Sequence, residues 1–211
     1  RGERFDDIGK LEWATNTLHQ TMAHISLGYY PAQICFPPIE TDLTYKPFMS
    51  SEILESLDDD QINVYRDVYQ QLIAPVMEEE NPGMVGISIV QQKQIIPTFT
   101  FSKMIKEDFP EVHITIGGNI VTRIRDELKT QDKLFGYIDS AILYEGESAY
   151  LQLVDAVGNS KPLSGLPNLI YRDESGIHAN KDVCSEDLSK LPPPDFDGLA
   201  LDKYFVPKLI L

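Results

Sequence analysis

The chain has 211 residues, enough for one domain of ordinary size with appended elements or for two small domains. With 42% hydrophobic and 24% charged residues, the composition excludes a disordered or low-complexity chain. Thirty-three acidic residues against 18 basic ones give a net charge of −15, which argues against nucleic-acid or anionic-membrane partners. No apolar run reaches about 18 residues, so no transmembrane segment is expected.

The start of the sequence and its two cysteines indicate what kind of protein the chain belongs to and in which compartment it is found. The chain starts at Arg1 without a secretory signal, which predicts a piece of a longer protein. Cys35 and Cys184 are too far apart, and too few, for a disulfide framework or a zinc site. Two free thiols are typical of a reducing compartment, so we expect a cytoplasmic protein.

The N-terminal part, residues 1–82, is predicted to be helical or irregular. Leu11–Ile25 is compatible with a helix and Gln33–Phe36 with a strand. Residues 40–80 carry nine of the fifteen excess negative charges, which favours a solvated acidic helical layer outside any cofactor site. Apolar positions from Gln61 onward follow helical spacing, and Pro75 is expected to kink or end that helix.

Residues 83–165 alternate between predicted strands and helices. The strands are Val85–Val90, Ile114–Ile116 and Tyr137–Leu143, whose apolar runs are typical of burial on both faces. Amphipathic helices separate them, and another follows around Ala149–Val157. This alternation predicts an α/β fold with a doubly wound, Rossmann- or flavodoxin-like parallel sheet in which these strands are central.

The C-terminal part is predicted to leave this pattern. In residues 166–190, two strand-like runs flank Glu174-Ser175, as in a β-hairpin. Residues 191–211 begin with Leu191–Asp197, which is too rich in proline for a helix or sheet and is interpreted as a linker.

In an open parallel sheet, ligands bind beyond the carboxyl ends of the strands. The loops expected there are Gln91–Gln94, Gly117–Asn119 and Tyr144–Glu147. Paired glycines let a ligand approach the backbone, although for the pair taken alone a plain tight turn is a slightly better explanation. Neither G-x-G-x-x-G nor a phosphate-binding P-loop is present, so these loops carry no nucleotide signature.

A catalytic set is not evident in the sequence. His19 and His24 are five residues apart on a predicted helix and therefore face different directions, and His113 lies within a strand. Glu145 and Glu147 could form an acid–base pair, but beside a glycine they are better explained as hydrogen-bond acceptors or helix N-terminal acids. The pattern therefore predicts a binding domain, with no catalytic residue and no metal ligand assigned.

Three strings in this order resemble the cobalamin-binding domain at the N-terminus of cobalamin-type radical SAM proteins. They are Val85–Val90 with the helix that ends at Pro110, then Ile114–Asn119, and then Asp139–Glu147. The tail formed by 191–197 and 201–205 resembles the linker that precedes the radical SAM barrel in that family. The resemblance covers residues 83–211 and hardly extends to the first 80.

The resemblance implies a cobalamin site at the carboxyl edge of the sheet. Ser88 matches the serine of the family's S-x-L position, where Val90 replaces the leucine, and the glycine pair would lie against the nucleotide tail of cobalamin. The loop Tyr144–Glu147 would lie near the corrin edge. The implied cofactor-binding residues are Ser88, Val90, Gln91, Gly117, Gly118, Asn119, Tyr144, Glu145, Gly146 and Glu147.

Two family motifs are absent. The D-x-H-x-x-G motif, which supplies an axial histidine in cobalamin mutases, does not occur, and neither does the cluster motif C-x-x-x-C-x-x-C. The resemblance therefore places the 4Fe-4S cluster and S-adenosylmethionine only in a missing C-terminal part of the parent enzyme, a methyltransferase or peptide maturase acting on a small molecule or peptide. The partner implied for this chain is that barrel domain.

Three hypotheses remain open from the sequence. The first is a cobalamin-binding domain that places the corrin beside the barrel of a larger radical SAM enzyme. The second is a degenerate domain that keeps the fold as a scaffold for docking or substrate recognition without the cofactor. The third is an unrelated flavodoxin-like domain that binds a small molecule or a partner.

Overall fold

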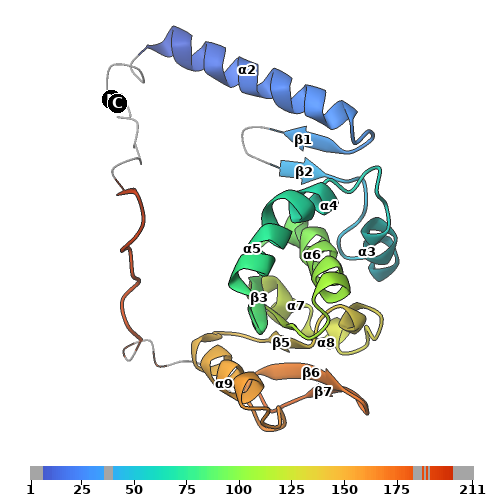
Figure 1. Cartoon of the computed structure of the whole chain (residues 1–211), viewed down its shortest axis with the longest axis vertical. Helices are drawn as coiled ribbons and strands as arrows, with labels where there is room; N and C mark the ends of the chain where they lie inside the picture. The colour runs from blue at the N-terminus through green and yellow to red at the C-terminus, as the bar shows by residue number, and fades with distance from the viewer. Residues whose placement is uncertain (1–6, 36–39, 183–186, 188, 190, 202–211) are drawn as a thin grey trace.

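A five-stranded sheet with helices against both faces forms the centre of the computed structural model (Figure 1). The structure describes residues 7–35, 40–182, 187, 189 and 191–201. In spatial order, the strands are β3 (Met84–Ser88), β4 (His113–Gly117), β5 (Ser140–Ile142), β6 (Leu169–Asp173) and β7 (Gly176–Ala179). The predicted α/β class is confirmed, and so is the parallel pairing of β3, β4 and β5.

The predicted strand order, that of a doubly wound sheet with all three parallel strands central, is only partly confirmed: the three strands are parallel neighbours, but not all of them are central. The strand order is sequential, so the winding does not reverse among the described strands, and β3 lies at an edge. β6 pairs antiparallel with β5, and β7 antiparallel with β6. The two C-terminal strands, which flank Glu174-Ser175, thus belong to the same sheet as the parallel strands. The sheet is mixed, with its parallel half at the β3 edge.

Three helices cover one face of the sheet, and a fourth packs on the other. Buried side chains of α6 (Ile95–Asp108), α7 (Asn119–Arg123) and α8 (Arg125–Leu128) form one core cluster with Ile114 and Ile116 of β4. α9 (Glu147–Gly158) packs against the opposite face, where Leu153 contacts the cluster of β5 and β6 side chains. Short 3-10 turns lie at Gln92–Gln94 and Leu134–Gly136.

The apolar run of the edge strand β3 predicted burial on both faces, but the structure shows only one face packed against the core. Val85 and Ile87 pack toward the α6 core, but Gly86 and Ser88, which alternate with them, are exposed on the α9 side.

At the amino end of β4, His113 Nε2 lies 2.8 Å from Ser140 Oγ, and burial lowers the pKa of this imidazole. This histidine is a structural residue of the sheet.

The acidic N-terminal stretch packs on α6. Its helices are α3 (Ser50–Leu57), α4 (Tyr65–Val68) and α5 (Ala74–Glu80), and a π-helical turn (Tyr69–Ile73) joins the last two. The wide turn lies directly before Pro75, whose ring would clash with the carbonyl of a regular preceding turn. Where the sequence predicted a kink or a helix end at this proline, the structure has a π-helical turn followed by α5.

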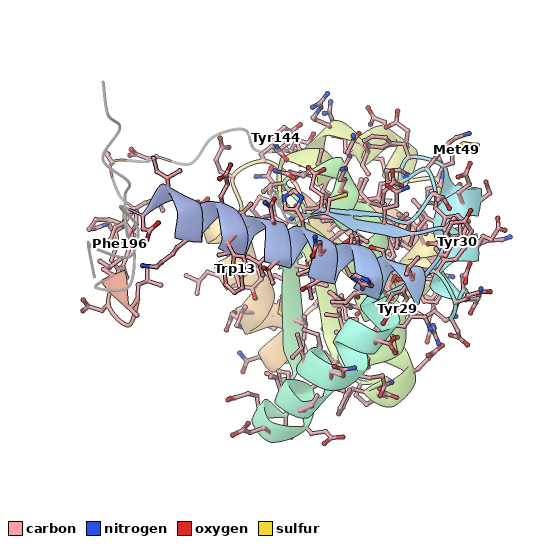
Figure 2. All side chains as sticks on the ribbon, turned by 90° about the horizontal axis from the view of Figure 1, so that it is seen from above. Trp13, Tyr29, Tyr30, Met49, Tyr144 and Phe196 are labelled. Carbon is pink, nitrogen blue, oxygen red and sulfur yellow. The ribbon has the colours of Figure 1, made fainter. Side chains whose placement is uncertain are left out.

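The first described helix, α2 (Ile8–Leu27), lies across the outside of the molecule, and none of its residues is buried (Figure 2). It is followed by the antiparallel pair β1 (Gln33–Cys35) and β2 (Glu40–Asp42). β1 matches the strand predicted at 33–36, except that Phe36 lies outside the described residues. No helix in the described part of the chain combines the length and the apolarity needed to cross a membrane.

At the C-terminal end, residues 191–200 contain neither helix nor strand. Most of the predicted 201–205 string, and the rest of the proposed linker to residue 211, lies outside the described residues.

Candidate functional site

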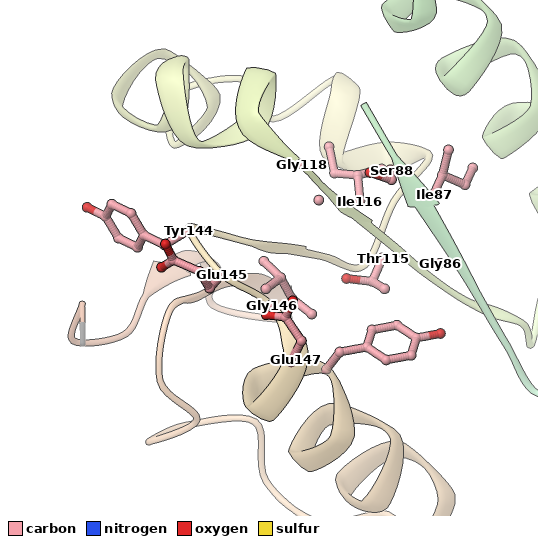
Figure 3. A pocket seen from close by; sticks show the side chains of 13 residues that line it. Gly86, Ile87, Ser88, Thr115, Ile116, Gly118, Tyr144, Glu145, Gly146 and Glu147 are labelled. Carbon is pink, nitrogen blue, oxygen red and sulfur yellow. The ribbon is translucent and has the colours of Figure 1, made fainter. Parts of the chain in front are cut away.

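A cleft of about 470 Å³ opens on the α9 face of the sheet, at the carboxyl ends of β3 and β4 (Figure 3). Seven of the ten residues implied by the resemblance line it, namely Ser88, Gly117, Gly118, Tyr144, Glu145, Gly146 and Glu147. The other lining residues, which sequence reasoning missed, are Gly86, Ile87, Thr115, Ile116, Ile142 and Tyr150. Of the three loops expected to hold a ligand, Tyr144–Glu147 lines the cleft in full, Gly117–Asn119 contributes its two glycines, and Gln91–Gln94 does not line it.

Small residues form the floor of this cleft. Gly86 is the register partner of Thr115, and Ser88 is the register partner of Gly117, so the four positions make a two-by-two patch across β3 and β4. Side chains alternate between the two faces of a strand, so Val85, Ile87, Ile114 and Ile116 fill the opposite side. At this patch the sheet is therefore packed with large side chains on one face and carries only small ones on the other.

Tyr150 of α9 covers one part of this floor. A Cβ built on Gly86 would lie 2.9 Å from Tyr150 Cε2 and 3.0 Å from its hydroxyl oxygen, closer than real Cβ contacts. Gly86 therefore makes room for the tyrosine ring. Tyr150 remains 40% exposed, so it forms a wall of the cleft without being sealed into the core.

The two glycines of the Gly117-Gly118 pair differ in structure. Gly118 has φ +98°, and a Cβ there would lie 2.5 Å from the carbonyl oxygen of Ile89. A Cβ on Gly117 would meet Ile142 O at 3.6 Å, an ordinary contact distance. Gly118 is thus needed by the backbone itself, whereas Gly117 keeps the cleft floor open.

The loop after β5 forms the rim. Tyr144 adopts φ 61°, and its backbone N–H donates to Thr122 Oγ1 at 2.7 Å. The Arg125 guanidinium lies 6.0 Å from the centroid of the Tyr144 ring. Glu145 and Glu147 are exposed, and Glu147 begins α9, where a negative charge favours the helix dipole. The rim therefore presents two carboxylates to a ligand.

Three of the implied residues, Val90, Gln91 and Asn119, do not line this cleft. Val90 is exposed, and Gln91 caps the 3-10 turn by reciprocal hydrogen bonds with Gln94. Gln91 lies instead with Ser88 on a neighbouring surface hollow. Asn119 begins α7. These residues shape the loops beside the cleft.

The sequence contains a pattern from which Gly86, one of the floor residues that sequence reasoning missed, could have been predicted. In Val85-Gly86-Ile87-Ser88-Ile89, large and small residues alternate, which indicates one packed and one open face. Thr115 had the same signal, since it lies between Ile114 and Ile116. Tyr150 had none, because its approach to Gly86 depends on where α9 packs.

Comparisons with known proteins give limited similarity. No protein-family model matches the sequence. An uncharacterized methyltransferase of Pyrococcus horikoshii is 27% identical over 133 residues, which are 63% of this chain and 28% of that protein. The chain thus spans well under a third of this relative's length.

Among solved structures, the radical S-adenosylmethionine methyltransferase TsrM of Kitasatospora setae is similar in two forms. The form with cobalamin and a [4Fe-4S] cluster is 19% identical, with a TM-score of 0.42 over 64% of this chain and 24% of that one. The form with tryptophan and a SAM analogue is 18% identical, with a TM-score of 0.42 over 69% and 28% of the two chains. A likeness at this level assigns no function to the present chain.

Proposed function

We propose that this chain binds cobalamin and places it beside the barrel domain of a larger radical SAM enzyme. The observation that carries the proposal is the cleft floor, where Gly86, Ser88, Thr115 and Gly117 leave the sheet bare next to α9. The nucleotide tail of cobalamin ends in a flat base, and a flat group needs a slot without protruding side chains. Cofactor sites of this kind are largely pre-formed and have a few placed polar groups.

The residues present fit such a group. A Cβ at Gly86 would displace the Tyr150 ring that forms a wall of the cleft, and the buried Thr115 hydroxyl on the floor has no hydrogen-bond partner. At the rim, the carboxylates of Glu145 and Glu147 can accept hydrogen bonds from the amide side chains of a corrin ring. None of the lining residues is a histidine, so we assign the cleft to the tail and the corrin edge rather than to cobalt ligation.

The activity of the parent protein is part of the same proposal. A bound corrinoid supplies a cobalt centre that can carry a methyl group, which agrees with the methyltransferase name of the Pyrococcus horikoshii relative. The two cysteines of this chain cannot form a 4Fe-4S site, so we place the cluster and S-adenosylmethionine in the barrel domain. The substrate would be a small molecule or a peptide bound there.

Mixing the chain with hydroxocobalamin, followed by desalting and an absorbance spectrum, tests the proposal. The parent should retain the corrin absorbance. Ser88→Leu should lose it, because a large side chain would rise from the open floor at a position that is exposed and free of core packing. Ser88→Ala is the matched control and should retain the cofactor, because it keeps the floor low.

Two results would oppose the proposal. A folded parent that retains no corrin absorbance would favour the scaffold hypothesis. Equal retention by Ser88→Leu and the parent would move the corrinoid away from this cleft.

A further inference from the structure

One polar atom in the cleft is unexplained by the protein alone. Thr115 is 2% exposed, and its Oγ1 is buried without any hydrogen-bond partner. Buried hydroxyls are normally hydrogen-bonded, because leaving one unpaired costs most of its hydration free energy. Figure 3 shows the Thr115 side chain on the side of the strands that faces the Tyr144–Glu147 loop. The unpaired hydroxyl therefore lies on the wall of the cleft.

The same end of the cleft is closed by an aromatic ring. Thr115 is the register partner of Gly86, and Tyr150 lies directly over Gly86. The ring and the hydroxyl thus meet at neighbouring positions of the floor. A flat, partly apolar group that enters from the rim would end against the tyrosine with one polar atom beside Thr115.

We propose that Thr115 and Tyr150 read the base at the end of the corrinoid's nucleotide tail. Thr115 would donate its hydroxyl hydrogen to the ring nitrogen of the base that does not carry the ribose, when that nitrogen is not bound to cobalt, and Tyr150 would set how deeply the base can enter. This inference rests on the proposed function and makes it more specific: the site selects corrinoids that carry a heteroaromatic lower base. A corrinoid without the tail, such as cobinamide, leaves both residues without a contact.

The test compares cobalamin and cobinamide by titration of the full 211-residue chain. The parent should bind cobalamin more tightly than cobinamide. Thr115→Val keeps the shape of the side chain and should weaken cobalamin binding on the order of tenfold, with cobinamide binding unchanged. Because the variant also removes an unpaired buried hydroxyl, its melting temperature without ligand should rise by about 2–4 °C.

Ser102 supplies a matched control. Its Oγ is the other buried side-chain atom without a partner in the described part of the chain, but it belongs to α6 on the opposite face. Ser102→Ala should therefore raise the melting temperature without changing the affinity for either corrinoid. Tyr150→Ala should reduce the preference for cobalamin, whereas Tyr150→Phe should retain it.

The outcomes separate this inference from the proposed function. If the parent binds neither corrinoid, both are overturned. If the parent binds both corrinoids and Thr115→Val leaves their affinity ratio unchanged, only the reading of the base by Thr115 is overturned. If Tyr150→Ala leaves the ratio unchanged, Tyr150 does not set the depth of the site.

Discussion

Gly117 and Gly118 are neighbours in sequence with different physical demands. Gly118 has a positive φ, which L residues with a side chain rarely adopt, and the Ile89 backbone leaves no space for a Cβ. Gly117 has neither restriction, and its bare Cα faces the cleft. The hypothesis of a plain turn therefore suits Gly118, whereas Gly117 has a bare position that is compatible with the proposed ligand surface.

We predict that Gly118→Ala destabilises the chain and that Gly117→Ala does not. The positive φ alone should cost about 1–3 kcal/mol, and the clash with Ile89 adds to it. A methyl group on Gly117 meets Ile142 at an ordinary distance, so its effect on unfolding should be small. Urea denaturation of both variants measures the difference, and equal midpoints would contradict this assignment of roles.

At the scale of elements, α9 connects the core to the cleft. Its Leu153 is fully buried against the β5 and β6 side chains, while Glu147 and Tyr150 on the same helix line the cleft. The position of this helix therefore sets both the width of the cleft and the place of its tyrosine wall. Packing on one side of the helix therefore positions the side chains that line the cleft on the other.

We predict that Leu153→Ala costs about 2–5 kcal/mol of the free energy of unfolding, because it leaves a cavity beneath α9. Corrinoid affinity should fall as well, since Tyr150 and the rim lose their fixed position. Leu151→Ala is the matched control: Leu151 is 72% exposed on the same helix, and its loss should change stability by no more than about 0.5 kcal/mol. An unfolding midpoint for Leu153→Ala equal to that of the control would contradict this role.

How far the sequence predicts these elements depends on which interactions define them. The alternation of strands and helices reports local burial, and it places the three parallel strands correctly. Strand order depends on pairing between distant segments, so the edge position of β3 could not be read from periodicity. β5 is also shorter than the predicted Tyr137–Leu143, because a 3-10 turn ends at Gly136 and the ladder begins only at Ser140.

At the scale of the whole molecule, negative charge and the cleft are separated. The acidic layer at 40–80 packs on α6, and none of its residues lines the cleft. Its last helix, α5, leads into the amino end of β3, whereas Ser88 of the cleft floor is the last residue of that strand and the rim carboxylates Glu145 and Glu147 follow β5. Five strand residues at about 3.3 Å each separate these ends by roughly 15 Å. This exceeds the Debye length of about 8 Å at physiological salt.

We therefore predict that replacing Glu78, Glu79 and Glu80 with glutamine changes cobalamin affinity by less than about twofold at physiological salt, although it removes three of the excess negative charges. These three side chains are exposed, so the fold should tolerate the change. Replacing Glu145 and Glu147 with alanine removes only two charges but deletes the acceptors at the rim, and it should weaken binding roughly tenfold or more. Titration of both variants with hydroxocobalamin shows whether cobalamin affinity depends on where the carboxylates lie or on the total charge of the molecule. A larger effect from the α5 triple variant than from the rim pair would mean that the field of the whole molecule, and not the local rim, controls binding.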